Sequence, residues 1–291
     1  MAAILESLGK EVTIVNGEAV PSHIAFIDPE QKVKVLDDDI DLATCAAVDV
    51  VMVLDTSAWV QLGPMAEVLR QTSATKIVVD HHVSQDDLGA ECFKDPPAEA
   101  TGRLVIEAAD ALGVALTRTM ATPLFAAIAT DTGWFRFPSV DETTFAAAKR
   151  LVASGARPHE IFAQLYERNS LERLRLRGRI LENMESACEG RLVFGQVTRA
   201  DFESTGSQPT DTEDVINRFL TVSGSQVAVL MLELPSGKIK VSLRSQDETD
   251  VRQVAEQFGG GGHRAASGVT LAGPLSKAKE QILDALRSAM S

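Results

Sequence analysis

The sequence predicts an α/β protein in which a larger domain, built on a parallel sheet with flanking helices, precedes a smaller α/β domain. The chain has 291 residues, enough for two domains of ordinary size. Hydrophobic residues make up 45% of it and charged residues 24%, as in folded globular proteins. In the first half, apolar runs rich in β-branched residues alternate with helical patterns, which is typical of βαβ units.

Four apolar runs in the first half predict strands, and two longer amphipathic segments predict helices. The predicted strands are residues 11–15, 23–27, 49–54 and 76–79, and the predicted helices are residues 64–73 and 98–112. Ligands of open parallel sheets gather at the carboxyl ends of the strands. The residues that follow these runs are therefore the first candidates for a functional site.

The second half begins with helices and continues with strands. Residues 142–187 carry apolar side chains at helical spacing, with one break at 155–158. Two strand patterns, at 226–234 and 238–243, flank a Pro-Ser-Gly turn and predict a β-hairpin. The remaining predicted elements are a helix at 250–258, a strand at 269–271 and a helix at 275–290.

We place the domain boundary where the helical pattern gives way to strands. The first domain is expected over residues 1–170 and the second over residues 191–291. The helical residues 171–190 between them are expected to form a linker.

Charge and composition exclude several classes of protein. The net charge is −13, whereas a protein that coats long nucleic acids needs a broad basic surface. No run of 18 or more apolar residues is present, so we expect no membrane span and no membrane partner. The three cysteines are widely separated, as suits reduced thiols, and the N-terminus shows no secretory leader. We expect a cytoplasmic protein, and a small anionic ligand is compatible with this composition.

Acidic and imidazole side chains follow three of the apolar segments. Asp55 follows the run VVMVL, Asp80, His81 and His82 follow KIVV, and Asp131 follows LFAAIAT. Carboxylates and imidazoles without thiolates favour Mn²⁺ or a similar divalent ion over structural zinc. Taken singly, Asp55 is typical of a helix N-cap, a histidine pair can be structural, and Asp131 can simply end its helix. Their conjunction at the strand ends of a parallel sheet favours a metal site.

A glycine run and one arginine point to an anion site in the second domain. The run consists of Gly259, Gly260, Gly261 and Gly262, and His263 follows it. Such a backbone can approach an anion with its N–H groups free, although glycine runs also serve as flexible linkers. The run lies between an amphipathic helix and a strand of one domain, which favours the anion site. Arg244, at the end of KVSLRS, would add guanidinium donors, but a single such arginine is more often a surface ion pair.

These motifs resemble those of a known family. Asp80-His81-His82 after an apolar strand resembles the signature of the DHH phosphoesterases, and GGGGH at 259–263 resembles that of their attached DHHA1 domain. The spacing of about 180 residues and the segments TDTGWFRFPS, LYERNSLERLRLRGRIL and GKIKVSLRS are similar to the bifunctional oligoribonuclease and PAP phosphatase branch. The resemblance extends over essentially the whole chain.

The resemblance implies a function, cofactors and roles for residues. The function is hydrolysis of short oligoribonucleotides and of 3′-phosphoadenosine 5′-phosphate with two Mn²⁺ ions. Asp55 matches a bridging ligand, and His81 and Asp131 match further metal ligands. His82 matches a catalytic residue that contacts the scissile phosphate, with Asp80 orienting its neighbours. Arg244 and the loop of residues 259–263 match the part that binds the nucleotide.

One part of the family pattern is not found. The family opens with a strand and a His-x-x-x-Asp-x-Asp motif, and no residue here can be assigned to it, since residues 1–9 already resemble the helix that follows. We therefore expect a start codon further upstream. In the chain as given we expect one Mn²⁺ ion or none to bind well, because a second ion would keep only Asp55.

The sequence thus predicts a metal-dependent phosphoesterase, with one alternative. The alternative is a catalytically impaired nucleotide-binding protein that lacks the first metal motif. Related pyrophosphatases share the DHH motif without the glycine loop, and single-strand exonucleases of the RecJ type are normally longer. A homodimer is compatible with the sequence.

Overall fold

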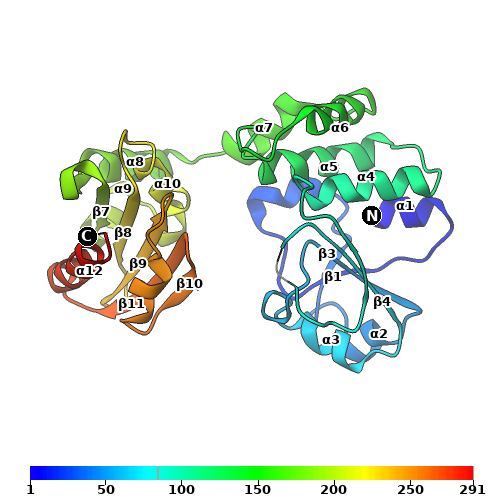
Figure 1. The fold of residues 1–291 in the computed structure, drawn as a ribbon, viewed down its shortest axis with the longest axis horizontal. Helices are drawn as coiled ribbons and strands as arrows, with labels where there is room; N and C mark the ends of the chain where they lie inside the picture. Colours follow the sequence, from blue (N-terminus) through cyan, green and yellow to red (C-terminus); the bar gives the residue numbers. More distant parts are fainter. Residues whose placement is uncertain (84, 291) are drawn as a thin grey trace. The chain divides into compact units, whose positions relative to one another are not determined.

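The computed structural model describes residues 1–83 and 85–290 (Figure 1). The chain divides into two compact units, Met1–Arg168 and Asn169–Ser291. Both combine strands with helices, so the predicted α/β class is confirmed. Within the described residues, none of the helices has the length and apolar character that crossing a membrane requires.

The strands of the first unit are all parallel to their neighbours. β1 (Ile14–Asn16) pairs with β2 (Val33–Val35). A separate sheet has the order β3-β4-β5, formed by β3 (Val50–Leu54), β4 (Thr75–Asp80) and β5 (Glu91–Lys94). Because β3 and β4 run the same way, the residues that follow them leave the sheet at the same edge. The predicted strands 49–54 and 76–79 therefore correspond to β3 and β4.

Helices make up most of the rest of the first unit. They are α1 (Ala2–Ser7), η1 (Ser22–Ile27), α2 (Leu42–Ala46), η2 (Trp59–Gln61), α3 (Met65–Gln71), α4 (Thr101–Ala111), α5 (Arg118–Asp131), α6 (Glu142–Ala153) and α7 (Pro158–Tyr166). The strand predicted at 23–27 is wrong, because this segment forms the 3-10 helix η1. Its Phe26 is partly buried against the apolar core of the helices, whereas Ile27 is 37% exposed.

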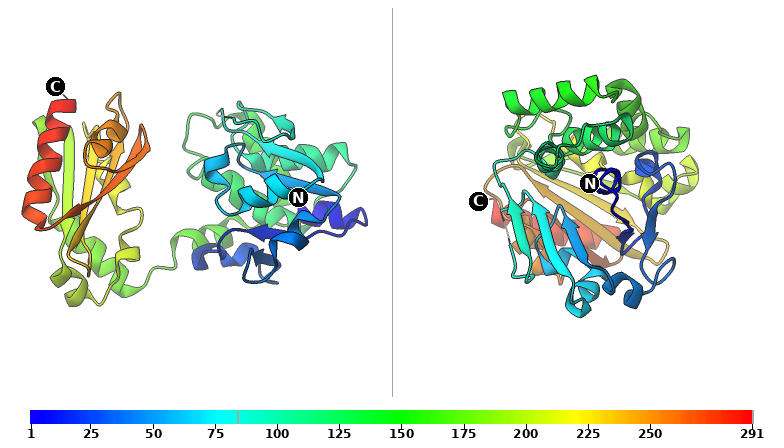
Figure 2. Two further views of the ribbon diagram at one scale, coloured as in Figure 1. Left: turned by 90° about the horizontal axis from the view of Figure 1, so that it is seen from below. Right: turned by 90° about the vertical axis from the view of Figure 1, so that its right-hand side faces the viewer.

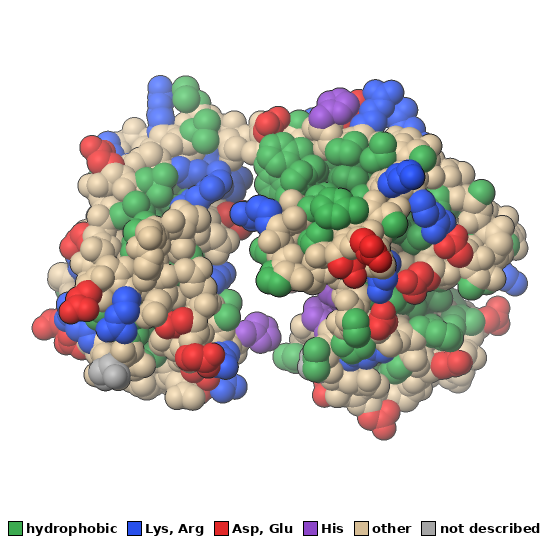
Figure 3. Space-filling view, turned by 45° about the horizontal axis from the view of Figure 1, so that its top comes forward, with side chains coloured by type: hydrophobic (Ala, Val, Ile, Leu, Met, Phe, Trp, Pro, Cys, Tyr) green, Lys and Arg blue, Asp and Glu red, His purple; other side chains and the backbone are tan. Residues whose placement is uncertain are grey.

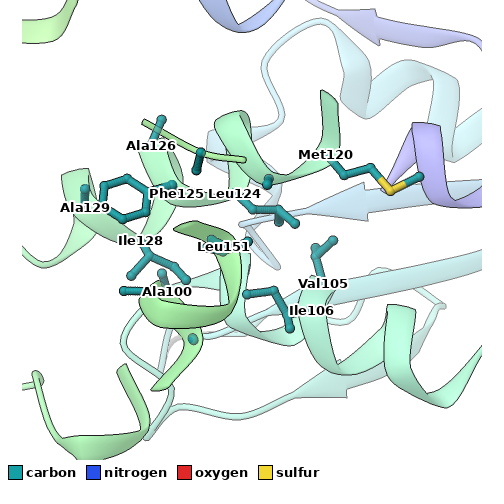
Figure 4. Close-up of a cluster of buried hydrophobic side chains, with 14 of the residues drawn as sticks. Ala100, Val105, Ile106, Met120, Leu124, Phe125, Ala126, Ile128, Ala129 and Leu151 are labelled. Atoms are coloured by element: carbon teal, nitrogen blue, oxygen red, sulfur yellow. The ribbon is translucent and has the colours of Figure 1, made fainter. Parts of the chain in front are cut away.

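A helical core fixes the position of α5. Ile128 of α5 and Leu151 of α6 are almost fully buried in one apolar cluster (Figure 4), and Ile4 of α1 belongs to the same cluster. Gly102 of α4 allows the close approach of α5, because a Cβ there would lie 3.1 Å from the Cβ of Ala127. The last residue of this firmly packed α5 is Asp131, so the core determines where that carboxylate lies.

Both faces of the β3-β4-β5 sheet are covered. Val78 of β4 packs with Leu69 of α3 on one face, and Val79 packs with Leu104 of α4 on the other. Successive side chains of a strand point to opposite faces, so a strand covered on both sides is apolar throughout. This burial holds the end of β4 rigidly.

The second unit is built on one six-stranded sheet in the order β10-β11-β9-β8-β7-β6. Its elements are α8 (Leu171–Glu182), β6 (Glu185–Ala187), η3 (Cys188–Gly190), β7 (Leu192–Val197), α9 (Arg199–Thr205), η4 (Pro209–Thr212), α10 (Val215–Phe219), β8 (Val227–Glu233), β9 (Lys238–Ser245), α11 (Val251–Glu256), β10 (Gly261–His263), β11 (Ala266–Ala272) and α12 (Leu275–Ala289). β8 and β9 form the predicted antiparallel hairpin.

Helices cover both faces of this sheet as well, as Figure 2 shows. Val227 and Val229 of β8 face the cluster that contains α11 and α12. Ala228 and Leu230 face the opposite cluster, which contains α8, α9 and α10. The alternation along β8 therefore produces a three-layer α/β/α unit.

Residues 171–190 do not form the separate linker that the sequence predicts. Leu176 and Ile180 of α8 are buried in the same cluster as Val193 of β7. The apolar face of α8 is thus part of the core of the second unit, which begins at Asn169.

Candidate metal centre

Two strand ends bring Asp55 and His81 together. β3 and β4 are paired in register, with Leu54 opposite Val79, and the backbone N–H of Asp55 donates to the Val79 carbonyl at 3.0 Å. Asp55 has a φ of 67°, a left-handed conformation that aspartate tolerates better than most residues. Its Oδ1 lies 3.7 Å from Nε2 of His81.

The end of α5 contributes a second carboxylate to the same place. Oδ2 of Asp131 also lies 3.7 Å from Nε2 of His81. Burial raises the pKa of Asp131 above its ordinary value, and the neighbouring charge of Asp55 raises it further. A cation bound between these two carboxylates and the imidazole nitrogen would be stabilised by their negative charges.

The other nitrogen of His81 is already engaged. Nδ1 lies 3.0 Å from the carbonyl oxygen of Ala98, so it must carry a proton and donate it. It is the other ring nitrogen, Nε2, that faces the two carboxylates. His81 is 18% exposed, which restricts its ring to this orientation. The backbone carbonyl of Ala98 therefore holds the imidazole as a metal ligand would need to be held.

His82 lies beside this group. One potential ligand atom from each of Asp55, His81 and His82 lies within 4.8 Å of the others, and the two imidazole rings are 4.7 Å apart. The ring of His82 is held by Asp80, whose Oδ1 lies 2.8 Å from its Nδ1 and accepts its backbone N–H at 3.0 Å. The structure thus brings together all three predicted metal ligands and the predicted catalytic histidine.

Asp80 is buried behind His82 and does not line the surface of the site. Its side chain is 0% exposed, so it cannot touch a substrate directly. The Ser57 hydroxyl donates to its Oδ2 at 2.6 Å, and Nζ of Lys94 lies 3.5 Å from the same oxygen. Burial alone would raise the pKa of Asp80, but hydrogen bonds from Ser57 and His82 outweigh it and lower the pKa from 3.8 to about 2. Asp80 is therefore ionised and acts through His82.

Three contributors to this centre were not predicted. Ser57 and Lys94 surround Asp80, with Nζ of Lys94 donating to the Ser57 hydroxyl at 2.9 Å, and Ala98 orients His81. Asp55-Thr56-Ser57 is typical of a helix N-cap, and because of that interpretation Ser57 was not predicted to belong to the centre. Lys94 lies opposite Asp80 in the pairing of β4 with β5, a register that no local sequence pattern indicates.

The glycine run of the second unit has packing roles that the sequence did not predict. The N–H groups of Gly259 and Gly260 donate to the carbonyls of Glu256 and Ala255, so they end α11 and are not free for an anion. A Cβ at Gly260 would lie 2.4 Å from the Gly268 oxygen. At Gly262 it would lie 2.6 Å from the Ala266 oxygen, whereas at Gly261 it would meet nothing within 4 Å. Gly260 and Gly262 are required for close approach to β11.

Arg244 and His263 share one row of the second unit's sheet. Ala266 of β11 is opposite Arg244 of β9 on one side and opposite His263 of β10 on the other. Residues paired in this way point to the same face, and the small side chain of Ala266 separates them. Nη1 of Arg244 donates to the Leu243 carbonyl at 3.0 Å, and no carboxylate among the described residues pairs with it. The row offers two donors that converge on one face.

Comparisons with known proteins relate the chain to a family. Residues 193–291 match the DHHA1 domain. A bifunctional oligoribonuclease and PAP phosphatase NrnA of Thermus thermophilus is 33% identical over 216 residues, which cover 74% of this chain and 64% of that protein. The protein of the same name from Bacillus subtilis is 28% identical over 207 residues, covering 69% and 64%. This chain therefore spans 64% of the length of each.

A solved structure supports the fold. An exopolyphosphatase-related protein from Bacteroides fragilis matches with a TM-score of 0.90 at 24% identity, covering 98% of this chain and 85% of that one. The second unit thus matches the DHHA1 domain that the glycine motif predicts, and the chain is similar to proteins named bifunctional oligoribonuclease and PAP phosphatase.

Proposed function

We propose that this relative of the DHH/DHHA1 phosphoesterases is a metal-dependent hydrolase of short oligoribonucleotides and of 3′-phosphoadenosine 5′-phosphate. The substrate class is that of the relatives named oligoribonuclease and PAP phosphatase. The observation that carries the proposal is the arrangement around Nε2 of His81, which faces Asp55 and Asp131 at 3.7 Å each while Nδ1 is fixed on a carbonyl.

The donor set fits a hard divalent cation. Asp55, His81 and Asp131 would hold it through two carboxylates and one imidazole, without a thiolate, which suits Mn²⁺ better than a structural zinc ion. When bound, such a cation polarises a phosphoryl oxygen and neutralises the charge that develops during hydrolysis.

His82 is the residue proposed to contact the scissile phosphate. Its Nδ1 faces the ionised carboxylate of Asp80, so this nitrogen carries a proton and donates it to Oδ1. The half-exposed remainder of the ring is free to face a phosphate oxygen. A donor held in place before the substrate arrives stabilises developing charge without reorganisation. Asp80 is a positioning residue in this scheme, and Ser57 and Lys94 maintain its charge.

The second unit is proposed to bind the nucleotide. Arg244 and His263 present donors from one row of the sheet, and guanidinium groups bind phosphate oxygens with charge-assisted hydrogen bonds. The backbone N–H groups of Gly259 and Gly260 take no part, because they end α11.

The test is hydrolysis of a 5′-phosphorylated diribonucleotide and of 3′-phosphoadenosine 5′-phosphate in Mn²⁺ buffer. We expect turnover that is lost with a chelator and in Asp55→Asn, which keeps the left-handed conformation at residue 55 but removes a charge. The exposed Asp38→Asn is the matched control and is expected to retain activity. A folded protein that binds Mn²⁺ and cleaves neither substrate would contradict the proposal.

A second candidate is a protein that binds nucleotides without cleaving them. One observation favours it: in the part of the chain that the structure describes, the metal-compatible group around His81 offers ligands for a single ion. Calorimetric titration with a non-hydrolysable dinucleotide, beside the turnover assay on the same preparation, distinguishes the two functions. Affinity without turnover supports binding alone.

A further inference from the structure

A strained turn follows Asp131 directly. Gly133, Trp134 and Phe135 have φ angles of 55°, 60° and 61°, so three consecutive residues adopt the left-handed conformation. Such a conformation is unfavourable for aromatic residues and rarely occurs in succession. Strained backbone of this kind persists only where the surroundings enforce it, and it concentrates at functional sites.

The surroundings of this turn do enforce it. The N–H of Trp134 donates to the Ala129 carbonyl at 2.6 Å, and the N–H of Phe135 donates to the buried Thr132 hydroxyl at 3.0 Å. Both aromatic rings pack against Phe125 of α5, with centroids 6.0 and 5.7 Å away. Trp134 and Phe135 therefore anchor the turn in the helical core. The strained turn in this way fixes the position of the two residues that follow it.

Those residues are Arg136 and Phe137. The ring of Phe137 lies close over Gly133, where a Cβ would be 2.5 Å from it, so a side chain at residue 133 would displace the ring. Phe137 is nevertheless 48% exposed, and hydrophobic side chains gather on the surface of this unit near α6 and α7 (Figure 3). Its ring is supported on one side and accessible on the other.

Arg136 is held in the same turn. Its Nε donates to the Gly133 carbonyl at 2.6 Å, which fixes the plane of the guanidinium group. Across residues 1–83 and 85–290, no carboxylate lies within ion-pairing distance of Arg136, although the chain carries a net charge of −13. An exposed, oriented and unpaired guanidinium group in an acidic protein is suited to a phosphate oxygen.

Both side chains lie near the candidate metal centre. Gly133, which contacts both of them, is two residues from Asp131, so the two Cα atoms are at most about 7 Å apart. This separation is comparable with the size of one nucleotide. This short chain distance allows a nucleoside next to a phosphate at the metal centre to contact Phe137.

We propose that Phe137 and Arg136 bind the nucleotide next to the scissile phosphate, Phe137 by stacking on its base and Arg136 by contacting a phosphate oxygen. The proposal rests on the proposed function for the position of that phosphate. The protein would then prefer substrates in which the base beside the cleaved bond is unpaired, because an unpaired base can leave its own stack and stack on the ring of Phe137.

The test uses a phosphorothioate-linked dinucleotide that carries 2-aminopurine, whose fluorescence falls when the base stacks. We expect the wild-type protein to bind this probe with quenching. Phe137→Ala should weaken binding about ten-fold and abolish quenching, and Phe137→Tyr should restore both. Phe137→Leu keeps an apolar cover over Gly133 but lacks an aromatic face, so it should behave like Phe137→Ala. The matched control is Phe145→Ala, since that exposed ring is already stacked on Phe135.

The outcomes separate this proposal from the proposed function. Quenching that survives in Phe137→Ala, or a wild-type protein that does not bind the probe, overturns the base-stacking role. A fall in Mn²⁺ affinity equal to the fall in probe affinity would show that Phe137 acts only by packing near Asp131. Quenched binding without hydrolysis of a normal dinucleotide rejects the hydrolase and retains the base contact. Arg136→Gln should weaken probe binding and reduce its salt dependence, with Arg136→Lys intermediate.

Discussion

The candidate metal centre and the glycine run were both predicted from short motifs, yet the structure uses their residues for different physical reasons. In the candidate metal centre, side chains would carry the proposed function, since carboxylate oxygens of Asp55 and Asp131 each lie 3.7 Å from Nε2 of His81. In the glycine run, the missing side chains are what matters, because Gly260 and Gly262 let β10 lie against β11. A motif identifies important positions, but only packing shows whether they serve a ligand or the fold.

The largest expected effect comes from the nitrogen at the centre of the metal site. His81→Ala removes the imidazole that both carboxylates face. We therefore expect Mn²⁺ affinity to fall more than a hundred-fold and hydrolysis to become undetectable. Calorimetric titration with Mn²⁺ measures the first and dinucleotide turnover the second. The exposed His159→Ala is the control. Unchanged Mn²⁺ affinity in His81→Ala would show that His81 does not hold the metal ion.

The glycine run offers the opposite kind of test. Gly260→Ala forces a Cβ against the Gly268 carbonyl, and we expect the free energy of unfolding to fall by about 2–3 kcal/mol. Gly261→Ala meets open space and should change it by less than about 1 kcal/mol. Urea denaturation of both variants makes the measurement. Equal effects would show that the run is not held against β11 as described.

A pH series examines the buried carboxylate beneath the metal centre. The pKa of Asp80 is about 2 in the folded protein against an ordinary 3.8, so its ionisation stabilises the fold above pH 3.8, and this contribution disappears as the pH falls towards 2. We expect Asp80→Asn to lose about 2 kcal/mol relative to the wild type near neutral pH, with the difference shrinking below pH 4. A difference that stays constant down to pH 2 would contradict the low pKa.

The same contrast explains what the sequence could predict. β3, β4 and the end of α5 follow from long apolar runs, and the carboxyl ends of neighbouring parallel strands lie at the same end of a sheet, so the proximity of Asp55 and His81 was predictable. Residues 23–27 were misassigned because a short apolar run fits a 3-10 helix as well as a strand. Lys94 could not be found, since its contact with Asp80 depends on pairing between distant strands. Local patterns predict elements, while long-range register places the supporting residues.

The smallest expected effect concerns the row formed by Arg244 and His263. Arg244→Ala removes a guanidinium group that has no carboxylate partner among the described residues, so the fold should lose little stability. We expect the KM for 3′-phosphoadenosine 5′-phosphate to rise about ten-fold with kcat nearly unchanged, because an exposed charge-assisted phosphate contact contributes about 1.5 kcal/mol. The control is Arg252→Ala, whose guanidinium group already pairs with Asp250.

A double-mutant cycle sharpens this last prediction. Arg244 and His263 flank Ala266 on one face, so a phosphate bound between them would contact both side chains. The effects of Arg244→Ala and His263→Ala on nucleotide affinity should then fail to add, because losing either contact loosens the ligand against the other. Strictly additive effects would mean that the two residues bind separate parts of the substrate. In that case Arg244 and His263 would not form a single phosphate site, although they lie in one row of the sheet.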